Sequence, residues 1–288
     1  MAVESWTPLK LLGWTQGFFA GKGVDAPRLT AELLLAQALG CDRVRLYLDF
    51  DKPLGDEELA RYRELVKRRA GGEPTAYLTG AREFFGHRLA VDPRVLIPRP
   101  ETEQLAELGL AALAEGGSAL DLGTGSGALA IALSLGRPGA AVTAVDLSPE
   151  ALEVARANAT ALGAAVTFLA GDLYAPLPPE QRFDVIVFNP PYLPTGELAG
   201  LQREVQREPR LALDGGADGL DLLRRVVAGA PARLATGGLL LLEMHESHLE
   251  SLPALCLAAG FASAEVRRDL AGLPRLTMAR MAASAPAA

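Results

Sequence analysis

The sequence predicts an α/β fold in which a doubly wound, mostly parallel sheet follows a small bundle of helices. From Ser118 onward, short apolar runs alternate with segments of helical character, a pattern typical of parallel strands joined by crossover helices. Residues 1–73, by contrast, contain helical patterns. The 288 residues are enough for one large and one small domain, and the apolar fraction of 49% indicates a well-filled core.

Residues 1–73 are predicted to form a helical bundle of their own. One strong helical segment covers Arg28–Leu39 and ends at Gly40, and another runs from Asp56 to about Arg69. The second segment is acidic at its start and basic at its end, which stabilises a helix through its dipole. We expect this bundle to act either as a partner-recognition domain or as a stabilising cap.

Residues 74–100 are predicted to form a β-hairpin linker, because short β-rich pieces are separated there by Gly and Pro. Residues 101–288 follow as the sheet domain. Its strands are predicted at residues 119–122, 141–146, 166–170, 185–188 and 239–243, and its helices at 101–113, 127–135, 149–162, 220–234 and 248–259. Ser148 is expected to cap the helix that begins at Pro149. Residues 264–269 and 275–281 are expected to close the sheet as an antiparallel hairpin. The polar, Gly-rich stretch 193–219 is expected to be a loop that covers substrate.

The composition argues against some classes of protein. Residues 1–73 hold 11 basic and 11 acidic side chains, so the remaining 17 basic and 24 acidic side chains give the whole net charge of −7. This balance lacks the broad positive field that attracts phosphate backbones, so no direct nucleic-acid binding is expected, although a local basic patch is not excluded. No apolar run is long enough to span a membrane, and the first residues lack the layout of a signal peptide. With Cys41 and Cys256 expected to be buried thiols, these features predict a cytoplasmic protein.

A glycine-rich loop joins the first predicted strand of the sheet to its helix, and acidic residues end the next two strands. The loop reads Asp121-Leu122-Gly123-Thr124-Gly125-Ser126-Gly127; its glycines allow close approach of a ligand, and its amides would receive a carboxylate. Asp146 is placed to accept hydrogen bonds from two ribose hydroxyls, and Asp172, followed by Leu173, lies where an adenine edge would lie. Together, these three strand ends fit S-adenosylmethionine better than NAD, whose loop more often reads Gly-x-Gly-x-x-Gly than the Gly-x-Gly-x-Gly found here.

The strand that ends at Phe188 continues into Asn189-Pro190-Pro191-Tyr192. Two prolines end the strand because neither can donate to the sheet, and they leave Asn189 and Tyr192 on a stiff loop where open α/β sheets bind ligands. The Asn189 side chain carries an acceptor and two donors, so it can bind a planar amide or amine. Taken alone, the same residues fit a proline-rich turn after a core strand equally well.

With Asn-Pro-Pro-Tyr at this place, the chain resembles the amino-methyltransferases, which methylate nitrogen on a planar amine. Further segments resemble the PrmC/HemK family of protein-(glutamine-N5) methyltransferases: Pro74–Gly80, Phe84–Gly86, Leu96–Glu103 and Glu208–Leu220. The resemblance extends over almost the whole chain. It implies a Rossmann-like, class I S-adenosylmethionine-dependent methyltransferase fold. It also implies transfer of the methyl group of S-adenosyl-L-methionine, with S-adenosyl-L-homocysteine as product, to the glutamine of the Gly-Gly-Gln motif in class-1 peptide release factors.

The residues and the resemblance together predict the members of the site. Catalytic roles are assigned to Asn189, Pro190 and Tyr192, and substrate binding to the same three residues together with Pro191. We expect the Asn189 side-chain oxygen and the Pro190 carbonyl to accept the two N–H bonds of the substrate amide, and Tyr192 to pack on that amide. Cofactor binding is assigned to Gly123, Thr124, Gly125, Ser126, Gly127, Asp146, Asp172, Leu173 and Asn189.

The chain departs from the family pattern at two places, and two other functions compete with the assigned one. Leu173 stands where some relatives carry an aromatic ring. His245 and His248 follow a strand end, but they lack the partners of a zinc site, so no metal is expected. A nucleic-acid adenine N6-methyltransferase would flip its base into the same Asn-Pro-Pro-Tyr pocket. A non-catalytic cofactor-binding adaptor is the other alternative.

Overall fold

The computed structural model describes residues 5–269 and 271–283. The chain divides into two compact units. The helical unit comprises the residues up to Ala81 together with Gln202–Arg207, and the sheet unit comprises Arg82–Leu201 and the residues from Glu208 onward. The helical unit is therefore assembled from two separate stretches of the sequence.

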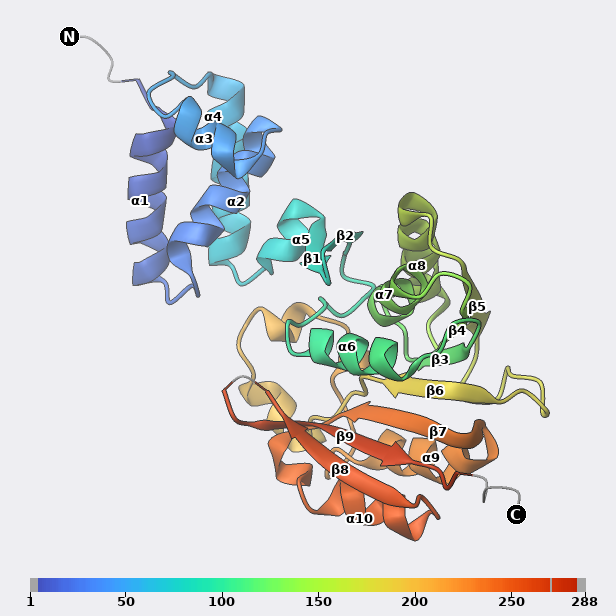
Figure 1. Cartoon of the computed structure of the whole chain (residues 1–288). Coiled ribbons are helices and arrows are strands. Elements are labelled where there is room, and N and C mark those ends of the chain that lie inside the picture. The colour runs from blue at the N-terminus through green and yellow to red at the C-terminus, as the bar shows by residue number, and fades with distance from the viewer. Residues whose placement is uncertain (1–4, 270, 284–288) are drawn as a thin grey trace. The chain divides into compact units, whose positions relative to one another are not determined.

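The helical unit contains five α-helices among its described residues (Figure 1): α1 Pro8–Gly21, α2 Pro27–Leu39, α3 Arg43–Leu48, α4 Asp56–Ala70 and α5 Thr75–Thr79. Its core includes Phe19, Leu34 and Leu35, all fully buried, and Leu78 of α5 packs into the same cluster. Residues 75–79 are therefore helical, where the sequence predicted part of a β-hairpin linker. A hairpin does follow, formed by β1 (Ala81–Phe84) and β2 (His87–Ala90).

The sheet unit is built on a sheet that has seven strands within the described residues. They are β3 Ser118–Leu122, β4 Ala141–Asp146, β5 Val166–Ala170, β6 Phe183–Phe188, β7 Leu234–Glu243, β8 Ser263–Arg268 and β9 Pro274–Arg280. The order is β5-β4-β3-β6-β7-β9-β8; the first five are parallel, and β9 runs antiparallel to both neighbours. The predicted fold with its closing antiparallel hairpin is confirmed.

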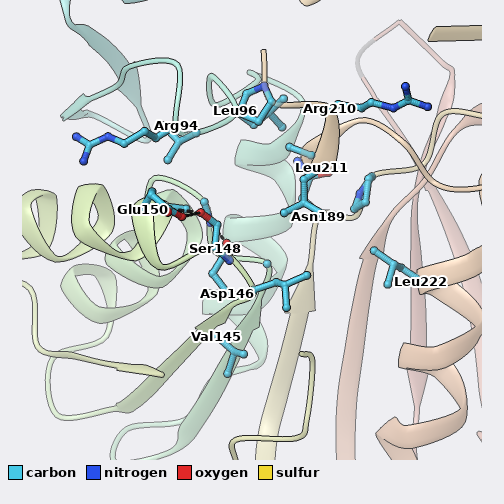
Figure 2. A pocket seen from close by; sticks show the side chains of 18 of the residues that line it. Arg94, Leu96, Val145, Asp146, Ser148, Glu150, Asn189, Arg210, Leu211 and Leu222 are labelled. Atoms are coloured by element: carbon cyan, nitrogen blue, oxygen red, sulfur yellow. Dashed lines mark hydrogen bonds between the residues drawn. The ribbon is translucent and has the colours of Figure 1, made fainter. Parts of the chain in front are cut away.

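The strand order reverses beside β3, because the chain builds β4 and β5 on one side of it and then β6 on the other. In open α/β sheets, ligands bind at the carboxyl ends of the strands flanking such a reversal. Asp146 ends β4 and Asn189 follows β6, and both side chains lie at this edge of the sheet (Figure 2).

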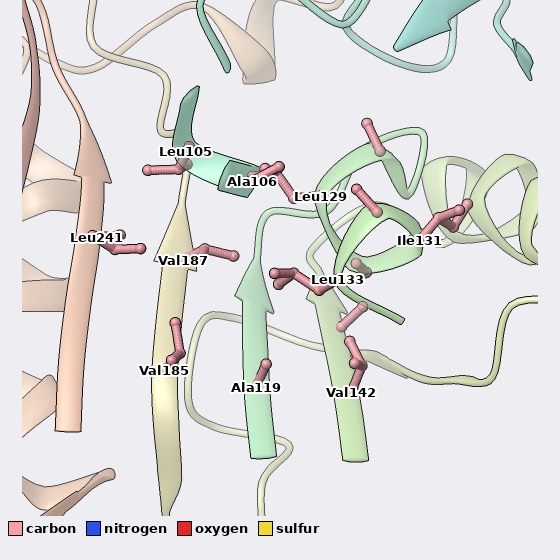
Figure 3. Close-up of a cluster of buried hydrophobic side chains, with 14 of the residues drawn as sticks. Leu105, Ala106, Ala119, Leu129, Ile131, Leu133, Val142, Val185, Val187 and Leu241 are labelled. Carbon is pink, nitrogen blue, oxygen red and sulfur yellow. The ribbon is translucent and has the colours of Figure 1, made fainter. Parts of the chain in front are cut away.

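Both faces of the sheet are covered, which explains the continuous apolar runs of its strands. Val185 and Val187 of β6 pack into one buried cluster (Figure 3), whereas Ile186 and Phe188 pack into the other. The first cluster contains side chains of α6 (Thr102–Ala112), α7 (Ala128–Gly136) and α8 (Pro149–Leu162). The second contains side chains of α9 (Asp221–Gly229) and α10 (Ser251–Ala258). As predicted, Ser148 caps α8, since its hydroxyl accepts from the Ala151 amide at 3.1 Å.

The stretch 193–219 was predicted to be a loop, and it contains short 3₁₀ turns: η1 Thr195–Gly200, η2 Val205–Arg207 and η3 Arg210–Ala212. Two further turns, η4 Ala230–Ala232 and η5 Glu246–His248, lie in the sheet unit. Cys256 is fully buried, but Cys41 is only half-buried, so the prediction of two buried thiols was wrong for Cys41. Within the part of the chain that the structure describes, every helix is too short or too polar to cross a bilayer.

Candidate active site

A cavity of about 450 Å³ lies at the carboxyl ends of β3, β4, β5 and β6 (Figure 2). Seven of the residues predicted from the sequence line it: Gly123, Gly125, Asp146, Asp172, Leu173, Asn189 and Pro191. The other predicted residues do not line it: Thr124, Ser126, Gly127, Pro190 and Tyr192. The volume lies within the range of small-molecule sites in proteins.

The glycine-rich loop adopts a conformation that side chains would disturb. Gly123, Gly125 and Gly127 all have positive φ angles, of 61°, 55° and 85°. A Cβ atom on Gly123 would come within 3.1 Å of the Phe188 ring. The loop therefore turns tightly and leaves its backbone close to the cavity.

Thr124 and Ser126 are buried, and they hold the loop in place. The Thr124 hydroxyl donates to Asp121 Oδ2 at 2.6 Å, and the Ser126 carbonyl accepts from Asn158 Nδ2 at 2.9 Å. Burial raises the pKa of Asp121 to about 7, although its hydrogen bonds oppose the shift. Asp121 thus supports the loop from beneath and stays outside the cavity lining.

Asp146 accepts two backbone hydrogen bonds, from Gly125 at 2.8 Å and from Ser148 at 2.9 Å. Burial raises the pKa of its carboxyl group, and the bonds from backbone amides lower it. Leu147, which follows it, lines the cavity with its side chain 55% exposed. This apolar contribution was missed, although its position directly after the strand-ending acid was a usable signal.

Asp172 and Leu173 reach the cavity from the end of β5. Asp172 also forms an ion pair of 2.6 Å with Arg225 of α9, a contact that was not predicted. Leu173 has a positive φ of 50°, a backbone conformation that is uncommon for a residue with a side chain. Leu173 thus adds an apolar side chain to the cavity lining.

A second wall of the cavity comes from segments far apart in the sequence. Pro93–Leu96 line one part, and Pro209–Ala212 line another. Glu208 joins the two stretches, because its carboxylate accepts from the Ile97 amide at 3.0 Å and from Arg99 Nη2 at 2.5 Å. Two of the segments that carried the family resemblance, Leu96–Glu103 and Glu208–Leu220, thus meet at a buried carboxylate.

Asn189 and Tyr192 connect to residues that were not predicted as members of the site. Asn189 Nδ2 donates to Thr102 Oγ1 at 3.0 Å, and Thr102 Oγ1 donates to Glu243 Oε2 at 2.7 Å. The Tyr192 hydroxyl reaches Glu243 Oε1 at 3.4 Å. Burial raises the pKa of Glu243 to about 7 and also raises the pKa of Tyr192. A charged residue at the end of the apolar run Leu239–Leu242 was the signal that could have identified Glu243.

The two histidines lie near the same loop. The rings of Tyr192 and His245 have centroids 6.3 Å apart. His248 is buried, its Nε2 lies 3.0 Å from the Asp218 carbonyl oxygen, and burial lowers its pKa. A neutral His248 donating to that carbonyl fastens the end of the 193–219 stretch.

Comparison with known proteins gives consistent results across the chain. Residues 10–80 match the family "PrmC N-terminal domain", and residues 102–204 match "Methyltransferase small domain". A release factor glutamine methyltransferase from Geobacter sulfurreducens is 47% identical over 96% of this chain and 98% of that protein. One from Neisseria gonorrhoeae is 44% identical over 88% of this chain and 93% of that protein.

Solved structures show the same fold at lower identity. A methyltransferase from Pyrococcus furiosus has a TM-score of 0.52 at 21% identity and covers 69% of this chain and 90% of its own. A 16S rRNA N2 G1207 methyltransferase from T. thermophilus, in complex with AdoMet and guanosine, has a TM-score of 0.50 at 23% identity. It covers 70% of this chain and 49% of its own.

Proposed function

The chain belongs to the family of release factor glutamine methyltransferases, and from this premise we propose that it methylates the side-chain amide N5 of the glutamine in the Gly-Gly-Gln motif of class-1 peptide release factors. The methyl donor is S-adenosyl-L-methionine. One observation supports this most strongly: Gly123, Asp146 and Asn189 line a single cavity, as the binding of a nucleoside beside a planar amide would require.

The residues around the cavity fit S-adenosylmethionine. Gly123 and Gly125 lack side chains at the point where the backbone comes close to the cavity, so the loop leaves room for the amino-acid part of the cofactor. The Asp146 carboxylate suits ribose hydroxyls, and Asp172 with Leu173 suits the adenine. When bound, the cofactor supplies an electrophilic methyl group on a sulfonium.

The substrate amide needs help because its nitrogen lone pair is delocalised into the carbonyl. Asn189 Oδ1 and the Pro190 carbonyl oxygen would accept the two N–H bonds of the glutamine side chain and hold its nitrogen in line for transfer. The same two oxygens stabilise the positive charge that develops on nitrogen. Tyr192 would pack against the flat amide, and Pro191 would complete the wall.

The helical residues 1–73 are proposed to recognise the release factor, with residues 74–100 as linker and residues 101–288 as the catalytic domain. The match of residues 10–80 to a domain family of its own supports a separate role for this part of the chain. The protein is proposed to act in the cytoplasm, where release factors work.

A methyl-transfer assay tests the proposal directly. We expect radiolabel from S-adenosylmethionine to enter an intact class-1 release factor and to disappear when the Gly-Gly-Gln glutamine is replaced by alanine. Adenine-containing RNA and duplex DNA serve as alternative acceptors in the same assay. Label in nucleic acid, with none in release factor, would instead identify an adenine N6-methyltransferase.

A further inference from the structure

Three polar residues from three elements form a hydrogen-bond chain that ends at Asn189. Asn189 follows β6, Thr102 begins α6 and Glu243 ends β7. The chain runs from Asn189 Nδ2 to Thr102 Oγ1 at 3.0 Å, and from Thr102 Oγ1 to Glu243 Oε2 at 2.7 Å. Thr102 is 4% exposed and Glu243 is 2% exposed, so water has little access to replace either partner.

The chemistry of the three groups determines the direction in which these hydrogen bonds are donated. An ionised Glu243 carboxylate only accepts, so the single hydroxyl proton of Thr102 must point to it. Thr102 Oγ1 can then only accept from Asn189. The Asn189 amide must therefore turn its NH₂ group toward Thr102, which leaves Oδ1 as the free polar atom of that side chain.

The other oxygen of the same carboxylate holds the far end of the loop. The Tyr192 hydroxyl lies 3.4 Å from Glu243 Oε1. Asn189 and Tyr192, the first and last residues of Asn-Pro-Pro-Tyr, are thus both connected to one buried group. Two prolines between them keep the intervening backbone stiff.

We propose that Thr102 and Glu243 are positioning residues, which orient the Asn189 side chain so that Oδ1 faces the amide of the substrate glutamine. This inference rests on the proposed function, because only an amide substrate requires an acceptor at that point. In the opposite orientation, Asn189 would present NH₂ to the N–H bonds of the substrate, and two donors would face each other. The orientation of one side-chain amide therefore decides whether the site binds its substrate productively.

When Glu243 is protonated, the direction of donation along these hydrogen bonds is no longer determined. A protonated carboxyl can donate to Thr102, which can then donate to Asn189 Oδ1 and reverse the amide. Burial, the largest cause, and the charge of Glu101 raise the pKa of Glu243 to about 7. The hydrogen bonds from Thr102 and Tyr192 and the charge of Arg275 oppose this rise. We expect kcat of the wild-type enzyme to fall as the pH drops through about 7.

The test uses the full-length enzyme with intact release factor and three variants. Thr102→Val keeps the side-chain shape but removes the hydroxyl, and we expect kcat to fall by about a hundredfold, as for a misplaced catalytic group. Thr102→Ser keeps the hydroxyl and should retain kcat within about threefold. Thr143→Val removes a buried hydroxyl in the middle of β4, away from the cavity lining, and serves as the matched control with unchanged kcat. Affinity for S-adenosylmethionine, measured by calorimetry, should stay the same in all three.

Glu243→Gln provides a second measurement that does not depend on how Thr102 variants fold. Glutamine can offer Thr102 either an acceptor or a donor, so we expect a lower kcat and loss of the acid limb of the pH profile near 7. Combined with Thr102→Val, it should reduce kcat no further than Thr102→Val alone, since both changes break one chain.

Failure of the inference differs from failure of the proposed function. If the wild-type enzyme methylates release factor and Thr102→Val retains its kcat, the positioning role is wrong and the function stands. If Thr102→Ser and Thr102→Val lower kcat equally, packing at this position matters and the hydroxyl does not, which also overturns the inference. A Glu243→Gln enzyme that keeps the acid limb would do the same. No transfer by the wild-type enzyme would overturn the function itself.

Discussion

Glu32 in the helical unit and Glu243 in the sheet unit are both 2% exposed, but their neighbours differ. Glu32 lies at hydrogen-bond distance from Arg28, Arg43 and Tyr47. Burial alone would raise its pKa, yet the bonds from Tyr47, Arg43 and Arg28 lower it overall. Glu243 receives bonds from two hydroxyls, and its pKa is raised.

The difference shows how one residue type serves two purposes. A buried carboxylate with cationic partners remains charged across the physiological range, which suits a structural role. A buried carboxyl whose hydrogen bonds come from hydroxyls titrates near neutrality, and such groups concentrate at functional sites. The exposed apolar side chains of the two units also differ. Among the described residues, the helical unit exposes aromatic rings such as Trp14, at 55%, whereas the large apolar side chains that the sheet unit exposes are aliphatic, such as Leu147.

Asn189→Ala gives the largest expected effect, because it removes the side chain that Glu243 is proposed to orient through Thr102. We expect kcat for release-factor methylation to fall by about a hundred- to a thousandfold, as for loss of one preorganised hydrogen-bonding group. Transfer of labelled methyl measures the loss, and calorimetry checks that S-adenosylmethionine still binds. Retained transfer with cofactor bound would remove Asn189 from the mechanism.

Glu243→Gln and Glu32→Gln are expected to change the free energy of unfolding in opposite directions. Because the folded-state pKa of Glu243 is raised, its ionised form destabilises the fold as the pH rises from about 4.5 through about 7. We expect the variant to be more stable than wild type at pH 8.5, by about 3 kcal/mol at most, with the difference vanishing toward pH 4.5. Urea unfolding at the two pH values measures this, and a less stable variant at pH 8.5 would contradict it.

Glu32→Gln is expected to lower the stability of the fold. Its folded-state pKa is lowered, so its contribution is present above about pH 4.5 and is lost as the pH falls below that value. At pH 7 we expect the free energy of unfolding to drop by about 1 kcal/mol, since the partner arginines are largely exposed. Thermal unfolding at pH 7 and pH 3.5 tests the claim, which fails if the variant is as stable as wild type at pH 7.

Trp14→Ala is expected to have the smallest effect and tests the exposed apolar side chains of the helical unit. Trp14 stacks on Phe18 at 5.2 Å between ring centroids, and more than half of its surface is exposed. If this unit recognises the release factor, KM for the intact protein should rise by about threefold to tenfold, the effect of losing a moderate contact. KM for a short Gly-Gly-Gln peptide should stay the same. An equal change for both acceptors would argue for a cap.

Sequence patterns predicted the parts of the fold that depend on local signals. The Ser148 cap, the glycine turn at Gly123 and the strand before Asn189 each follow from a few neighbouring residues. Helix α5 was missed because five residues carry little periodicity, and Leu78 is buried only through tertiary packing.

The connections within the site could not be predicted in the same way. Thr102 and Asn189 are 87 positions apart, and Thr102 and Glu243 are 141 positions apart. A strand end predicts where a side chain emerges, but the identity of its partner depends on which strands become neighbours. The pairing of Asp172 with Arg225 is a further case, because only the folded chain brings β5 near α9.

Gln202–Arg207 belong to the helical unit although they are distant from it in sequence. This affects how the unit can be moved to another protein and how the protein should respond to limited proteolysis. Arg69 is 5% exposed and pairs with Glu204 at 2.7 Å. A fragment cut after Ala81 would keep this buried guanidinium and lose its carboxylate. Transplanting the unit to another protein therefore requires two inserted pieces, and nicking the chain on either side of residues 202–207 should loosen a helix that is distant in sequence from the cut.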